Sequence, residues 1–136
     1  MRIMALDYGT KRVGIAVSDP LQIIATALTT VHPEELFEFI QNYMLTEPVE
    51  TIVVGYPLQT SGQASVTASH VVGLIRRLKK KFPGISIESL DERYTSKMAS
   101  AAIAQSGLSR KARQDKGRID RMSAVILLQD YMGRLV

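Results

Sequence analysis

The sequence predicts an α/β fold with a single mixed five-stranded sheet, an antiparallel three-strand meander plus two parallel strands, flanked by helices. Short apolar runs within residues 2–31 are separated only by turn residues, which is typical of antiparallel strands. From residue 34 onward, helical and strand patterns alternate, and this alternation implies parallel strands. The sequence contains no linker or internal repeat, so we expect one domain over residues 1–136.

The first strand carries an acid. Residues 4–6 form the continuous apolar run of a strand buried on both faces, so Asp7 should emerge from the middle of a sheet. Residues 9–12 turn the chain, residues 13–19 return as a second strand, and residues 23–31 supply the third. An ionised aspartate at such a place needs a metal, a basic partner or N–H donors, and each of these would make Asp7 a site residue.

The later elements follow from helical spacing, β-branched runs and proline or glycine breaks. We expect helices over residues 34–47, 66–82, 97–105 and 119–134, and strands over residues 50–55 and 85–90. Residues 106–118 contain two glycines and almost no apolar periodicity, so this segment should be mobile.

Composition narrows the class of protein. A hydrophobic content of 46% in 136 residues is enough for a real core. No apolar stretch approaches the roughly 20 residues of a membrane span, and no leader pattern opens the chain, so we expect a cytoplasmic protein without membrane contact. Zero cysteines exclude disulfides, thiolate zinc sites and a cysteine nucleophile. With two histidines, any metal site must be mostly oxygen-ligated.

Basic residues are unevenly distributed. Residues 13–75 contain no lysine or arginine, whereas residues 76–136 hold fourteen of the 17. Such asymmetry suggests a basic face and a polyanionic partner such as nucleic acid. For one cluster we favour a simpler interpretation. Its charged side chains form the solvent-exposed face of a helix, and their positive charge complements the negative C-terminal end of the helix dipole. This cluster is Arg76, Arg77, Lys79, Lys80 and Lys81.

Carboxylates stand at several element ends. Asp7, the pair Asp91-Glu92 and Asp120 each lie at a strand end or helix start where the pattern points inward. Asp120 begins a helical stripe that continues through Ala124, Leu127 and Tyr131. Converging acids without histidine or cysteine suit Mg²⁺ or Mn²⁺, and such ions, often a pair roughly 3.5–4 Å apart, serve phosphoryl transfer.

Each acid also has a structural interpretation. Asp7 could bond to turn amides or pair with Lys11 or Arg12, Asp120 is favoured by the helix dipole, and residues 91–93 could form a surface ion pair. The presence of three acids at three inward-facing ends favours a site. The basic residues beside these acids could hold a nucleic-acid backbone, and they are Lys11, Arg12, Arg93, Lys116 and Arg118.

Four segments, residues 7–19, 53–58, 91–96 and 116–120, together resemble the YqgF family of RuvX-like proteins over essentially the whole chain. The resemblance implies a single RNase H-like nuclease domain and a role in processing the 5′ end of pre-16S rRNA, hence in ribosome biogenesis. Members have also been called Holliday junction resolvases, by similarity to RuvC-type enzymes. Carried onto this sequence, the catalytic and metal-binding acids are Asp7, Glu92 and Asp120, with two Mg²⁺ or Mn²⁺ ions as cofactors.

The sequence departs from the RuvC pattern at one acid. RuvC-like resolvases carry an acid after the fourth strand, where this chain reads Gly55-Tyr56-Pro57, so the second acid must follow the fifth strand. If the fourth strand lies between the first and fifth, a separation of roughly 10 Å must be bridged. The longer side chain of Glu92 favours it over Asp91, but the alternation of the strand does not settle the choice.

Other functions stay open. Structured RNA and branched DNA are both possible substrates, and resolving a symmetric junction calls for a homodimer, whereas RNA trimming needs only a monomer. Residues 7–16 also resemble the phosphate-binding hairpin of actin-like and sugar-kinase ATPases, which predicts nucleotide binding instead. A non-catalytic RNA-binding assembly factor would show the same charge asymmetry.

Overall fold

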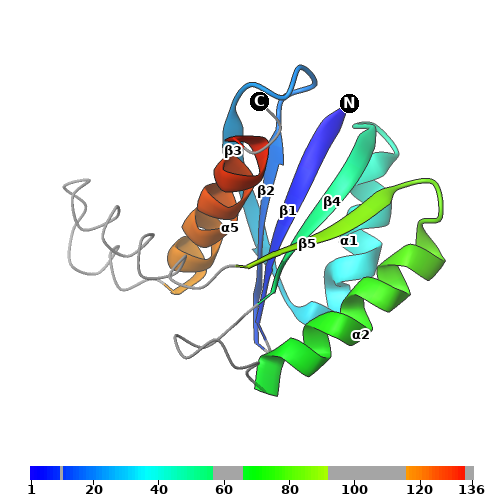
Figure 1. Cartoon of the computed structure of the whole chain (residues 1–136), viewed down its shortest axis with the longest axis vertical. Coiled ribbons are helices and arrows are strands. Elements are labelled where there is room, and N and C mark those ends of the chain that lie inside the picture. Colours follow the sequence, from blue (N-terminus) through cyan, green and yellow to red (C-terminus); the bar gives the residue numbers. More distant parts are fainter. Residues whose placement is uncertain (10, 57–65, 92–115, 134–136) are drawn as a thin grey trace.

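A computed structural model describes residues 1–9, 11–56, 66–91 and 116–133. Five strands form one sheet in the order β3-β2-β1-β4-β5 (Figure 1). Their bounds are β1 Arg2–Tyr8, β2 Val13–Ser18, β3 Ala25–Val31, β4 Val49–Tyr56 and β5 Ser86–Asp91. β1, β2 and β3 pair antiparallel, and β4 and β5 are parallel additions beside β1. The predicted mixed sheet is therefore confirmed.

Helices cover both faces of this sheet. A short 3-10 helix, η1 Pro33–Glu35, leads into α1 Leu36–Met44, and the other described helices are α2 Val66–Lys81 and α5 Lys116–Gly133. Figure 1 shows α1 and α2 on one face of the sheet and α5 on the other. Within the described ranges, no helix combines the length and the apolar character that crossing a membrane requires.

Strand alternation divides the core into two clusters. On β1, Met4 and Leu6 pack against α1 and α2 through a cluster that includes Leu36 and Leu74. Ile3 and Ala5 point to the opposite face and pack against α5, in a cluster with Ala16, Val53, Ala124, Leu127 and Leu128. The central strand is thus buried on both faces, as its apolar run predicts.

Three elements differ from the predictions by two residues or more at a boundary. β3 begins at Ala25 rather than residue 23, because the Asp19 carboxylate accepts hydrogen bonds from the backbone N–H groups of Leu21, Ile23 and Ile24 and holds residues 19–24 in a loop. The helix predicted from residue 34 starts as a 3-10 turn capped by His32 and ends at Met44.

The last helix begins at Lys116, three residues before its predicted start. Residues 116–118, which were predicted to be part of the mobile segment, are therefore helical instead. The rest of that segment, together with the helix predicted over residues 97–105, lies outside the described residues.

Candidate active site

Asp7 lies near the carboxyl end of β1 and is only 9% exposed. Alternation places it on the same face as Ile3 and Ala5, the face that α5 covers. β1, β4 and β5 are parallel, so their carboxyl ends meet at this edge of the sheet. The predicted position of Asp7, emerging from the middle of the sheet, is confirmed.

The turn after Asp7 is tightly closed. The N–H of Gly9 donates to the carbonyl oxygen of Arg12 at 2.8 Å. A Cβ atom added to Gly9 would lie 2.8 Å from that same oxygen, so a larger residue would force the turn apart. Lys11 is exposed and Arg12 is half-buried. Two cations predicted to contact nucleic acid thus lie in the turn that directly follows the acid.

A row of residues runs across the sheet from Asp7 toward α5. Asp7 is opposite Gly14 on β2, and Gly14 is opposite Thr30 on β3. The guanidinium of Arg121 on α5 donates to the Thr30 hydroxyl oxygen at 3.2 Å. The first turns of α5 are therefore anchored to the row that contains Asp7.

The helix backbone places Asp120 one residue before that anchor. The stripe predicted to follow Asp120 packs against the sheet, since Ala124 and Leu127 are buried and Tyr131 contacts the same cluster. Lys116 and Arg118 lie in the same first turns of α5. The first turns of α5 thus carry all three of these predicted site residues.

The second predicted acid follows β5. β4 lies between β1 and β5, so two strand spacings of about 4.8 Å separate the first and fifth strands. β5 ends at Asp91, opposite Tyr56, the last residue of β4. Glu92 and Arg93 lie outside the described residues, and the choice between Asp91 and Glu92 stays a prediction. Among the described residues, no three Asp, Glu or His side chains gather into a metal-binding group.

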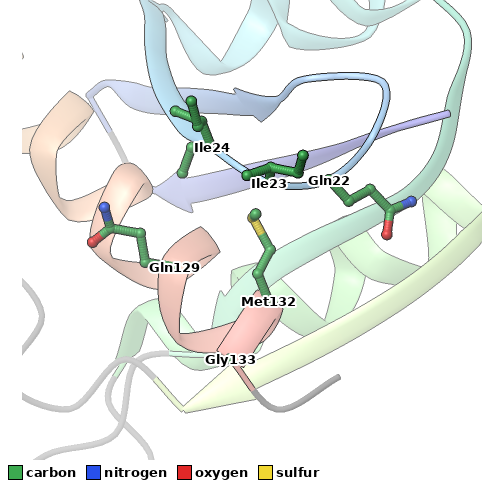
Figure 2. Close-up of a pocket in the computed structure, with 7 residues that line it drawn as sticks. Gln22, Ile23, Ile24, Gln129, Met132 and Gly133 are labelled. Atoms are coloured by element: carbon green, nitrogen blue, oxygen red, sulfur yellow. The ribbon is translucent and has the colours of Figure 1, made fainter. Parts of the chain in front are cut away.

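A cavity of about 430 Å³ lies at the other end of the sheet, between the 19–24 loop and the end of α5. Figure 2 shows Ile23 and Ile24 of the loop on one side and Gln129 and Met132 of α5 on the other. None of the described residues that line it carries a carboxylate or another titratable side chain, so they supply none of the predicted metal ligands.

Sequence reasoning missed the acid beside that cavity. Asp19 accepts three backbone N–H groups, and these hydrogen bonds, that from Ile24 first, hold the pKa of its carboxyl below the usual range. The Asp19-Pro20 step was the available signal, since aspartate commonly binds the backbone of such turns. Asp19 thus has a structural role. It directly follows β2, whereas Asp7 is paired with Gly14 near the beginning of that strand.

Comparison with known proteins places the chain among nucleases. A family model described as "RuvX: Holliday junction resolvase" matches residues 1–134. A protein of Bacteroides thetaiotaomicron is 48% identical over 131 residues, which cover 96% of this chain and 95% of the relative. One from Flavobacterium johnsoniae is 47% identical over 131 residues, with the same coverage of 96% and 95%. Both relatives are named "Putative pre-16S rRNA nuclease".

Two solved structures share the fold. The Fowlpox virus resolvase, in complex with Holliday junction DNA, matches with a TM-score of 0.56 at 13% identity, over 100% of this chain and 99% of that one. Thermus thermophilus RuvC in complex with its Holliday junction substrate matches with a TM-score of 0.53 at 14% identity, over 99% of this chain and 96% of that one. These likenesses show an RNase H-like fold, as the motifs predict.

Proposed function

The chain belongs to the RuvX family, also called YqgF, and we propose that it is a metal-dependent nuclease that cleaves phosphodiester bonds during 5′-end processing of pre-16S rRNA. The observation that carries the proposal is the row formed by Asp7, Gly14 and Thr30. Through Arg121, this row ties a buried carboxylate to the helix that carries Asp120. The names of relatives at 47–48% identity support RNA as the substrate.

We propose Asp7, Glu92 and Asp120 as ligands of two Mg²⁺ or Mn²⁺ ions. The donor chemistry fits, because Asp7 offers carboxylate oxygens from a nearly buried position and the chain has no cysteine. When bound, such ions supply positive charge against the phosphate and make a water more acidic. Asp7 would hold its carboxylate in a fixed orientation, since β1 is packed on both faces.

The faces of β5 favour Glu92 over Asp91 as the second ligand. Ile87 packs with the cluster under α1 and α2, whereas Leu90 packs with the cluster under α5. Even-numbered positions of β5 therefore face α5, as Asp7 does. If the alternation continues for one residue beyond the described strand, Glu92 shares the face of Asp7.

The cations beside the acids would position the RNA backbone. Lys11 and Arg12 follow Asp7 in the hairpin turn, and Arg93, Lys116 and Arg118 follow or precede the other two acids in the sequence. Contacts of this kind bind phosphates without reading sequence, so selection of the cleavage position must come from RNA structure.

Resolution of four-way DNA junctions is a second candidate function. The description of the matching family model favours it. Cutting a symmetric junction at two places needs two active sites related by symmetry, so this function requires a homodimer, whereas RNA trimming needs a single chain. We further infer that residues 1–136 act as one domain in the bacterial cytoplasm, where precursors of ribosomal RNA are processed.

The decisive experiment compares the natural protein with Asp7→Asn on a pre-16S rRNA fragment and on a synthetic four-way DNA junction, each with Mg²⁺, Mn²⁺ or EDTA. We expect metal-dependent cleavage of the RNA, lost in EDTA and reduced at least about 100-fold by Asp7→Asn. Glu38→Gln removes an exposed carboxylate on α1 and serves as the matched control, with unchanged activity expected.

The same assay separates the alternatives. Cleavage of the junction alone would favour resolution over RNA processing. Binding of RNA without cleavage by any variant, under every metal condition, would contradict the nuclease proposal and favour an assembly factor. Glu92→Gln and Asp91→Asn then test the second ligand, and full activity of Glu92→Gln would exclude Glu92.

A further inference from the structure

A basic surface lies on α2, away from the acids. It consists of Arg76, Arg77, Lys79, Lys80 and Lys81, all of them exposed, and we call it the α2 surface. No acidic residue occurs anywhere in α2. Across the described ranges of the chain, none of these five cations forms a salt bridge. Five positive charges within six residues are therefore left without a carboxylate partner there.

An aromatic ring from α1 meets this surface. The guanidinium carbon of Arg77 lies 5.1 Å from the centroid of the Phe37 ring. Phe37 in turn stacks on the buried Phe82, with ring centroids 6.5 Å apart and planes 12° from parallel. Phe37, Arg77, Lys80 and Lys81 line an open groove of about 490 Å³. One arginine of the α2 surface is thus held in place beside a groove with basic walls.

The helix dipole explains only part of this cluster. Lys79, Lys80 and Lys81 lie in the last turn of α2, where cations interact favourably with the dipole. Arg76 and Arg77 lie before that turn, and each is four residues from another cation, at positions 80 and 81. Like charges at this spacing destabilise a helix. A cluster of like charges to which the described residues offer no carboxylate partner is expected where an anionic ligand binds.

We propose that the α2 surface is a second RNA-binding site, which holds phosphates of the substrate at a distance from the cleavage site. α2 packs on the face of the sheet opposite to the one that carries Asp7 (Figure 1). One RNA segment cannot contact both faces without passing around an edge of the sheet. The α2 surface therefore adds affinity for large structured RNA and contributes nothing to binding of a short segment at the acids.

The surroundings of the groove favour RNA over an anionic membrane. A helix that binds at a membrane surface needs large apolar side chains beside its cations. Among the described residues, Val72 is the one large exposed apolar side chain on α2, and it is 39% exposed. A groove with cations and a fixed arginine suits a phosphodiester backbone.

The test measures RNA affinity in EDTA by fluorescence anisotropy, with a structured pre-16S rRNA fragment at about 50 to 200 mM KCl. The proposal relies on the proposed function only for the choice of RNA, and binding in EDTA is read without cleavage, so the two can fail separately. The variant is Arg77→Gln/Lys80→Gln. Its control, Thr26→Glu/Gln129→Glu, changes the net charge equally at two exposed positions outside the α2 surface.

We expect Arg77→Gln/Lys80→Gln to weaken binding about 10-fold more than the control, with a salt slope smaller by roughly 1.4–1.8 because two phosphate contacts are lost. Phe37→Leu should weaken binding about 2- to 5-fold with an unchanged slope, since it removes the ring under Arg77 but no charge. Equal affinities and slopes for the two double variants would overturn the proposal. The proposal would also be overturned if Arg77→Gln/Lys80→Gln lost binding to vesicles of anionic phospholipid but kept its affinity for RNA.

Discussion

The phenol hydroxyl of Tyr131, in the last turn of α5, donates a hydrogen bond to a carboxylate oxygen of Glu88 on the edge strand β5. Arg121 anchors the other end of the same helix to Thr30 on β3. These two contacts connect α5 to both edges of the sheet. They thereby fix the helix that carries Asp120 relative to the strand that leads to Glu92.

The Tyr131 contact should be visible as an alkaline titration. Burial first, and then the hydrogen bond and charge of Glu88, raise the pKa of Tyr131 to about 12. A raised tyrosine pKa means that the contact stabilises the fold fully below the ordinary value of 10.0 and is lost as the pH rises toward about 12. The difference in phenolate absorbance between the natural protein and Tyr131→Phe isolates this group. Glu88→Gln should lower the pKa, and an identical titration in that variant would contradict the assignment.

Gly9 and Gly73 should respond in opposite ways to alanine. A Cβ atom at Gly9 would lie 2.8 Å from the Arg12 carbonyl oxygen, whereas nothing lies within 4 Å of one at Gly73. Gly9→Ala should lower the free energy of unfolding by about 1–3 kcal/mol, because backbone must move. Gly73→Ala should raise it by roughly 0.5–1 kcal/mol, because alanine favours the helix. Urea denaturation measures both, and equal effects would refute the turn geometry.

Ser18 should be important for stability despite its small size. It is fully buried, its hydroxyl oxygen accepts the Ile3 N–H at 2.8 Å, and the hydroxyl lies 2.9 Å from the Asp19 carbonyl oxygen to which it donates. Ile3, whose N–H donates to Ser18, also follows the point where the pairing register of β1 with β4 shifts. Ser18→Ala leaves a buried N–H without its acceptor and should cost about 1–3 kcal/mol of unfolding free energy. Thr26→Ala, at an exposed position on β3, is the control and should cost far less.

The 19–24 loop should loosen in acid. The lowered pKa of Asp19 means that its hydrogen bonds stabilise the loop above the ordinary value of 3.8 and are lost as the pH falls through the lowered pKa. Hydrogen exchange at the amides of Ile23 and Ile24, corrected for intrinsic rates, should therefore accelerate when the pH falls below the lowered pKa of Asp19. Asp19→Asn has no carboxyl to titrate, so it should show no such acid-dependent step. If the acid-dependent step persists in Asp19→Asn, a group other than Asp19 must cause it.

Much of the fold could be read from local patterns, since these report which side chains are buried. The apolar run before Asp7 identified a strand buried on both faces, and the structure packs Leu6 and Ala5 into clusters on opposite faces. The stripe through Ala124 and Leu127 identified the face of α5 that contacts the sheet. Boundaries were less accurate where side chains bind the backbone, as Asp19 does before β3.

The described strands and helices and the inward position of Asp7 could be predicted from the sequence, because hydrophobic periodicity and turn residues are local properties. The row formed by Asp7, Gly14 and Thr30, its contact with Arg121 and the position of the α2 surface on the opposite face of the sheet could not be predicted in this way. Such relationships depend on strand order and register. These arise from contacts between residues far apart in the chain, which no local pattern encodes.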